Sequence, residues 1–217
     1  MRKRTTVWML GPACALALAA SADEKAPTTF DFEHDAPGGE PHGFEYGRTG
    51  EGRPGKWVVR VEEGATSGTH ALVQTDADDT DNRFCVAHAG PPLQNLRLSV
   101  RCKPISGKVD QGCGLVWRLR DADNYYLARA NALEDNVRLY HVVKGSRRQL
   151  GSWSGKVKSG VWHELAIENI GDHVQVFFNG KRIIDEHDKT FTDAGRFGVW
   201  TKADSVIAFD DLTASPK

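Results

Sequence analysis

Residues 174–184 read VQVFFNGKRII, and this stretch decides the fold class. Two runs rich in β-branched and aromatic residues flank Asn179-Gly180, the dipeptide that two-residue β-hairpin turns prefer. Asn and Gly tolerate the positive φ angles of such a turn, so the chain reverses there and the two runs pair. The sequence therefore predicts an antiparallel hairpin over residues 173–186.

The same pattern recurs along the chain. Residues 121–124, DADN, separate the apolar runs 115–119 and 125–129 in the same way, and further short runs separated by turn residues continue to residue 213. No segment shows a convincing amphipathic helix. Many short strands with regular turns predict an all-β fold, a two-sheet antiparallel sandwich.

The N-terminus has the features of an export signal. Basic residues at positions 2–4 precede an apolar run over residues 7–20, and Ala20-Ser21-Ala22 supplies the small residues of a cleavage site. The apolar run is shorter than the roughly 20 residues of a membrane span. We expect a secreted or periplasmic protein with a signal peptide at 1–22, cleaved near Ala22, a flexible leader at 23–29 and one domain at 30–217.

The net charge of the chain and the length of its apolar segments limit the classes of partner that it can bind. The 217 residues have a formal net charge of −1, and loss of the signal peptide removes three basic residues and no acids. Bulk charge therefore does not draw the mature chain to nucleic acid or to anionic membranes. No second apolar run could span a bilayer, and we expect a monomer.

Three cysteines follow the signal peptide. Alternating apolar residues in 96–102 and 113–119 can be aligned as neighbouring strands, and that register places Cys102 opposite Cys113. An exported protein can hold a disulfide there, and the alternative is two buried thiols. If the disulfide forms, Cys85 is the unpaired thiol, buried in the strand 83–87.

Strand alternation divides the side chains of the middle strands between two faces. If Trp117, Ala128 and Leu139 face the core, polar and aromatic side chains gather on the opposite, outward face. Aromatic rings suit the C–H faces of sugars, and arginines suit hydroxyl and carboxylate groups. The alternative is an ordinary solvated face with cross-strand pairs. The predicted ligand-binding residues are Arg118, Tyr125, Arg129, Asn131, Arg138, Tyr140, Trp200 and Lys202.

Several segments resemble known jelly rolls. Residues 162–168, WHELAIE, and 171–181, GDHVQVFFNGK, resemble the hairpin of laminin-G-like and concanavalin A-like domains, and residues 195–201 resemble the strand that follows it. Residues 123–127 and 136–140 resemble exported bacterial proteins near the family 16 glycoside hydrolases and the 3-keto-disaccharide hydrolase domains. The likeness spans about residues 30–214 and implies a concanavalin A-like jelly-roll sandwich.

The resemblance also implies a structural calcium ion. Exported jelly rolls often hold one Ca²⁺ where the first strand, an early Ser-Gly loop and the last strand meet, and Ca²⁺ prefers carboxylate and carbonyl oxygens. The alternatives are that these acids only solubilise the strand ends, or that the acidic loop 76–81 holds the ion. The implied ligands are Asp31, Glu33, Ser67, His70 and Asp210.

The function that these observations favour is an exported carbohydrate-binding protein that recognises a glycan on one sheet face. The alternatives are a glycoside or 3-keto-glycoside hydrolase and a laminin-G-like protein-interaction module. Hydrolysis of a glycosidic bond needs two suitably spaced carboxyl groups. The acidic strand motif of family 16 is missing, since Glu134 and Asp135 fall in a turn. The sequence therefore identifies no catalytic residue, and we expect no organic cofactor.

Overall fold

The computed structural model describes Met1 and residues 26–217. Residues 2–25 lie outside the described residues, and with them lie the predicted signal peptide, its cleavage site and the start of the predicted leader. In the described part the chain forms strands and turns without an α-helix, so no helix there could span a membrane.

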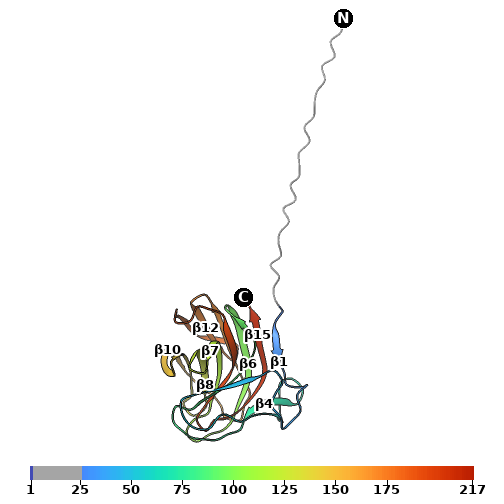
Figure 1. Ribbon diagram of the computed structural model, residues 1–217, viewed down its shortest axis with the longest axis vertical. Helices are drawn as coiled ribbons and strands as arrows, with labels where there is room; N and C mark the ends of the chain where they lie inside the picture. The colour runs from blue at the N-terminus through green and yellow to red at the C-terminus, as the bar shows by residue number, and fades with distance from the viewer. Residues whose placement is uncertain (2–25) are drawn as a thin grey trace.

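Fifteen strands run through residues 28–216, and several of them are labelled in Figure 1. They are β1 (Thr28–Phe30), β2 (Glu45–Thr49), β3 (Trp57–Val61), β4 (His70–Gln74), β5 (Phe84–Leu93), β6 (Leu96–Ser106), β7 (Gly112–Asp121), β8 (Asn124–Asn131), β9 (Asn136–Val143), β10 (Ser146–Ser154), β11 (His163–Ile170), β12 (His173–Phe178), β13 (Lys181–His187), β14 (Gly195–Lys202) and β15 (Val206–Pro216).

The strands form two antiparallel sheets that pack as a sandwich. Sheet A has the order β13-β12-β11-β6-β15-β4-β3, with β1 added beside β15. Sheet B has the order β10-β9-β8-β7-β14-β5-β2. The Asn179-Gly180 turn joins β12 to β13 with positive φ at both residues, and the Asp121–Asn124 turn joins β7 to β8. The predicted all-β jelly-roll sandwich is therefore confirmed.

A disulfide connects the two sheets through the main core. Cys102 on β6 and Cys113 on β7 have Cα atoms 6.4 Å apart and form this bridge. The expectation that these two strands pair as a hairpin is wrong, because β6 pairs with β11 and β15 in sheet A, whereas β7 lies in sheet B. Residues 112–119 are buried on both faces, so apolar alternation could not fix the register of β7. Cys85 is an unpaired, buried cysteine.

Sheet B is strongly curved, and its concave face points away from sheet A. The guanidinium carbon of Arg147 on β10 lies 5.0 Å from the ring centre of Phe84 on β5, although four strands lie between these two. In a flat sheet β10 and β5 would be roughly 24 Å apart. The Thr49 hydroxyl on the edge strand β2 likewise reaches the Tyr125 hydroxyl on β8, at 2.8 Å. The outer face of sheet B is therefore concave.

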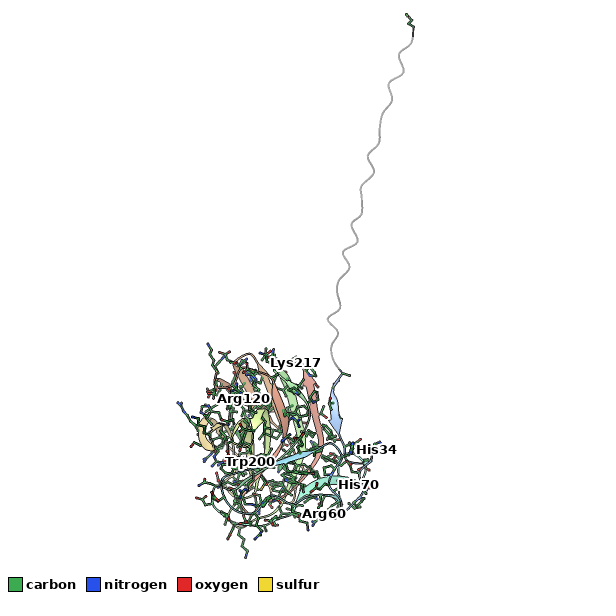
Figure 2. The ribbon with its side chains drawn as sticks, viewed as in Figure 1. His34, Arg60, His70, Arg120, Trp200 and Lys217 are labelled. Atoms are coloured by element: carbon green, nitrogen blue, oxygen red, sulfur yellow. A yellow bond between two sulfur atoms is a disulfide. The ribbon has the colours of Figure 1, made fainter. Side chains whose placement is uncertain are left out.

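The concave face encloses a second apolar cluster, separate from the core between the sheets. Its centre is the pair Phe84 and Trp200, whose ring centres are 5.2 Å apart. The cluster consists of Phe84, Val86, Val116, Leu119, Tyr125, Leu127, Tyr140, Val142 and Trp200. Sheet B is thus buried on both faces over much of its area, and Figure 2 shows Trp200 within the body of the molecule.

Two early segments differ from expectation. Residues 34–56 are rich in Gly and Pro, a composition typical of a loop, but they contain β2, which pairs with β5. Its sequence, EYGRT, lacks the apolar alternation by which strands are recognised. Phe30 and Phe32 alternate with acids, a pattern typical of a strand, but β1 ends at Phe30, because Phe32 has a φ of 60° that breaks the extended run.

Candidate functional site

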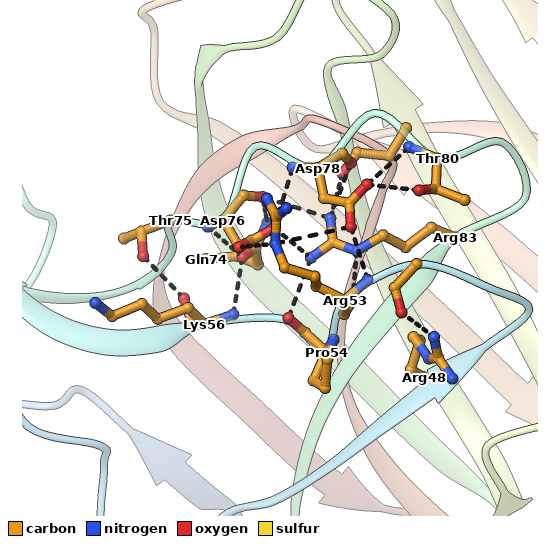
Figure 3. Close-up of polar contacts among 12 residues, drawn as sticks. Arg48, Arg53, Pro54, Lys56, Gln74, Thr75, Asp76, Asp78, Thr80 and Arg83 are labelled. Carbon is orange, nitrogen blue, oxygen red and sulfur yellow. Dashed lines mark hydrogen bonds and ion pairs between the residues drawn. The ribbon is translucent and has the colours of Figure 1, made fainter.

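A buried arginine organises the loops at the start of β5, as Figure 3 shows. Arg83 is fully buried and donates hydrogen bonds to the carbonyl oxygens of Arg53 and Ala203, both at 2.7 Å. Its guanidinium also pairs with the Asp76 carboxylate at 2.9 Å. These bonds tie the loop around Arg53 and the acidic loop 76–81 to the end of β14 and fix the residues next to Arg83.

The acidic loop 76–81 is part of the set of bonds around Arg83, which we call the Arg83 clamp. Asp76 accepts from Arg53 as well as from Arg83, and Asp78 accepts from the Thr80 hydroxyl at 2.6 Å and from the Arg53 amide at 2.7 Å. The hydrogen bond from Thr80, with those from the Arg53 and Thr80 amides, holds the pKa of Asp78 well below its ordinary value. Two of the carboxylates that the sequence offered as a second calcium site, Asp76 and Asp78, are thus engaged by side chains and amides of the chain itself.

A pocket of about 430 Å³ opens beside this clamp, at the mouth of the concave face of sheet B. Asn82 and Phe84 line it from the start of β5, and Gly145, Ser146 and Arg147 line it from the turn between β9 and β10. Gly145 has a φ of 76°, which glycine adopts without strain and which lets the turn close tightly. Asn82 and Ser146 are exposed, whereas Phe84 is buried at the pocket's base.

Arg147 is held in this pocket by aromatic rings. Its guanidinium carbon lies 4.5 Å from the ring centre of Tyr140 and 5.0 Å from that of Phe84, a cation–π arrangement. Its NH1 atom is buried and has no hydrogen-bond partner among the described residues. No ion pair within residues 26–217 includes Arg147. The pocket therefore contains an oriented cation to which the described chain supplies no anion.

A second polar group lies at the other end of the same face, where β8 and β9 meet. Arg129 donates to Asn136 at 2.7 Å and to the Glu134 carboxylate at 2.9 Å. The Asn131 amide donates to Glu134 and to Asp110, and Lys202 pairs with Asp110 at 3.0 Å. Burial alone would raise the pKa of Glu134, but the hydrogen bonds from Asn136 and Arg129 outweigh it and lower that pKa to about 2. This network keeps Glu134 ionised, although the Nε atom of Arg129 is buried without a hydrogen-bond partner among the described residues.

The structure corrects the predicted solvent-facing surface. Six of the eight predicted ligand-binding residues are buried. For all of these but Arg118, the reason is that the sheet curls and turns its outer face into an interior. Arg138 and Lys202 keep partly exposed side chains, at 37% and 18%. The ligand-binding role of the set stays a prediction, but it does not form an open face. The buried six are Arg118, Tyr125, Arg129, Asn131, Tyr140 and Trp200.

Arg118 differs further from expectation. Its φ of 44° lies within a register shift between β7 and β8, so simple alternation does not apply to it. Its guanidinium donates to the carbonyl oxygens of Gln94, Phe191 and Gly171, which are loop positions. Arg118 therefore braces loops that connect strands of both sheets.

The segments implied as a calcium site do come together, at the end of β1. The Glu33 carboxylate accepts from the Thr69 and His70 amides at 2.9 and 2.5 Å, and Asp210 accepts from the Ser67 amide at 3.0 Å. Asp31 accepts from the Glu33 amide at 3.2 Å. Figure 2 shows His34 and His70 together at this side of the molecule.

The donors there suit a hydrogen-bonded clamp better than a cation. The carboxylate oxygens face N–H groups, which a Ca²⁺ ion would have to replace. Within the described residues no group of three or more His, Cys, Asp or Glu side chains is placed to hold a metal. Calcium binding stays a prediction.

Sequence reasoning missed the pocket residues. Asn82 precedes β5 and Phe84 begins it, whereas Ser146 and Arg147 lie on β10, so the two pairs come from parts of sheet B that are far apart in strand order and meet through its curvature. Residues 144–148, KGSRR, contain three cations and no acid in one turn, and this was the signal available in the sequence.

The sequence was compared with protein-family models and with known proteins. No protein-family model matches the chain. A levanase of Bacillus subtilis (strain 168) is 28% identical over 96 residues, which cover 43% of this chain and 14% of the levanase. The chain thus corresponds to a small part of that protein.

Two solved structures have the same architecture. A carbohydrate-binding module, CBM66, from Bacillus subtilis superposes with a TM-score of 0.64 at 18% identity, over 80% of this chain and 97% of the module. A protein of unknown function with a galectin-like fold, also from Bacillus subtilis, superposes with a TM-score of 0.55 at 12% identity, over 80% and 90% of the two chains. At these identities the likeness shows the fold, a jelly-roll sandwich.

Proposed function

We propose that this chain is an exported carbohydrate-binding module that holds a glycan in the pocket formed by Asn82, Phe84, Gly145, Ser146 and Arg147. The likeness to CBM66 supports a binding module, because it covers nearly all of that module and most of this chain. The stretch similar to a levanase supports the same class of ligand.

The pocket itself carries the proposal. It combines an aromatic ring, Phe84, with a fixed guanidinium, Arg147, and with the exposed polar side chains of Asn82 and Ser146. Sites for small ligands are concave and place a few polar groups on an apolar base. The hydroxyl groups of a sugar can bind such polar groups, and its C–H faces can pack on the apolar base. The buried Arg83 clamp holds one wall of the pocket and a tight turn forms the other, so the site is preformed.

The chemistry favours binding over hydrolysis. General acid or nucleophilic attack on a glycosidic bond requires carboxyl groups at the bond, and no carboxylate lines this pocket. Asp110 and Glu134 both accept from Asn131, which brings two carboxylates near each other elsewhere on the face. Asp110 is almost fully buried and paired with Lys202, and the lowered pKa of Glu134 makes it a poor proton donor.

Export rests on the predicted signal peptide at residues 1–22, and the Cys102–Cys113 disulfide fits an oxidising compartment. A glycan, bound by a monomer, is the partner that we propose.

A glycan array tests the proposal with two matched variants. Ser146→Tyr places a ring in the pocket from an exposed position, and Thr192→Tyr makes the same change at an exposed loop position that does not line the pocket. We expect the unmodified protein and Thr192→Tyr to bind the same glycans and Ser146→Tyr to lose them. Full binding by Ser146→Tyr would move the site elsewhere, and a blank array for all three proteins would refute a carbohydrate-binding function.

A further inference from the structure

We infer that the pocket selects glycans that carry an anionic group, a carboxylate or a sulfate ester, and that Arg147 binds this group. The inference rests on the proposed function, because it names the class of glycan that the same pocket would take.

The fully buried arginines among residues 26–217 all have acceptors, whereas Arg147, which is half-buried, has none there. Arg83 pairs with Asp76, Arg129 pairs with Glu134, and Arg118 donates to three carbonyl oxygens. Among residues 26–217, Arg147 has neither a carboxylate nor a carbonyl partner, although its NH1 is buried. Removing this one NH1 group from water without an acceptor is costly, and a bound anion would offset that cost.

The guanidinium is also oriented in advance. Contact with the rings of Tyr140 and Phe84 restricts the long Arg147 side chain before any ligand arrives. A planar fork of donors matches the two oxygens of a carboxylate or sulfate, and little further rotamer entropy is lost when such a fork is already fixed. The arrangement therefore favours an anion that offers two oxygens to the fork over a single hydroxyl.

The surroundings of Arg147 have the matching charge. Lys144 lies in the same turn as Arg147, and the residues that line the pocket include no acid. Asp123 is the acid beside this turn: its carbonyl oxygen accepts from the Gly145 amide at 3.0 Å, and a carboxylate oxygen lies 3.4 Å from where a Cβ atom on Gly145 would stand. Basic groups around a cleft raise the local concentration of anionic ligands.

Binding of three sets of oligosaccharides to the full chain tests this inference by titration calorimetry. The sets are neutral oligosaccharides, their counterparts with uronic acids, and their counterparts with sulfate esters. We expect at least one anionic set to bind about tenfold or more tightly than the neutral set, the factor that one hydrogen bond to a charged group supplies. The two anionic sets tell a carboxylate site from a sulfate site. The preference should weaken as salt rises, because screening acts on a partly exposed cation.

Two variants with the same loss of charge locate the effect. Arg147→Gln should remove the preference for anionic glycans, whereas Arg148→Gln, at an exposed neighbouring position on β10, should keep it. Arg147→Lys retains the charge without the fork and should keep only part of the preference, which separates loss of the anion contact from loss of folding. Equal binding of neutral and anionic sets by the unmodified protein would overturn the inference and leave the proposed function standing. Failure of every set of oligosaccharides to bind would overturn both the inference and the proposed function.

Discussion

Buried arginines are the residues on which this structure depends most. Arg83, Arg118 and Arg129 are each almost inaccessible to solvent, and each donates to several acceptors from loops or turns. A sequence shows an arginine in a strand but not the acceptors that loops bring to it. This is why Arg129 was expected to face outward without an acidic partner, whereas it is buried and paired with Glu134.

Replacing Arg129 should therefore destabilise the fold. Arg129→Met keeps the aliphatic stem but leaves Asn136 and Glu134 without their donor, and we expect a loss of about 1–3 kcal/mol in the free energy of unfolding. Arg138→Met is the matched control, because Arg138 is 37% exposed and only 3.7 Å from the same carboxylate, a pair worth less than about 1 kcal/mol. Urea unfolding of both variants measures the difference. Equal losses would show that burial of Arg129 contributes nothing.

Glu134 should make stability depend on acid. Its ordinary pKa of 4.5 falls to about 2 in the folded protein, because hydrogen bonds from Asn136 and Arg129 outweigh the effect of burial. A carboxyl whose pKa is lowered by folding stabilises the protein above its unfolded pKa, and this contribution is lost as the pH falls from about 4.5 to about 2. Urea midpoints between these pH values should fall less steeply in Glu134→Gln. A parallel decline in both proteins would mean that Glu134 is not the group responsible.

At the scale of elements, local signals in the sequence were reliable and long-range ones were not. The Asn179-Gly180 and Asp121–Asn124 turns form as predicted, because their geometry is set by the turn residues themselves. The proposed pairing of β6 with β7 failed, since a strand buried on both faces has no polar side to fix its register. β2 was not predicted, because this short, polar edge strand lacks the alternation of apolar and polar residues by which strands are recognised.

The disulfide should contribute strongly, because it joins β6 of one sheet to β7 of the other. The two cysteines are 11 positions apart in the sequence, and closing a loop of this size in the unfolded chain corresponds to about 2–3 kcal/mol. The double variant Cys102→Ala/Cys113→Ala should lose that stability in urea unfolding. Cys85→Ala is the control, a buried cysteine without a bridge whose pKa burial raises to about 11. A double variant as stable as this control would contradict the assignment.

The predicted calcium ion has a direct thermal test. If Ca²⁺ binds where Glu33, the loop at Ser67 and Asp210 meet, the melting temperature should be higher in calcium than in EDTA, since a ligand of the native state stabilises by mass action. Magnesium serves as the control for ionic strength. Identical melting curves in calcium and EDTA would show that the hydrogen bonds from the Thr69, His70 and Ser67 amides hold these segments without a metal.

For the whole molecule, the two-sheet sandwich could be predicted from the sequence, whereas the curvature of sheet B could not. The two-sheet sandwich follows from period-two patterning and turn residues, which are properties of the sequence. Curvature arises from the packing of Phe84, Tyr140 and Trp200 across the sheet, and it buries the face that alternation had presented as open. The same curvature brings Arg147 to Phe84 and creates the pocket. The site could therefore be located only in the folded chain.

The central claim is that a glycan binds in the pocket between the start of β5 and the β9–β10 turn. Amide and side-chain chemical shifts of the labelled protein, recorded as the best glycan from the array is added, test it most directly. The largest changes should occur at Asn82, Phe84, Ser146 and Arg147, with little change at the separate pocket lined by Tyr46 and Pro54. Saturable changes centred on Tyr46 and Pro54, or no change at Arg147 while the glycan binds, would contradict the claim.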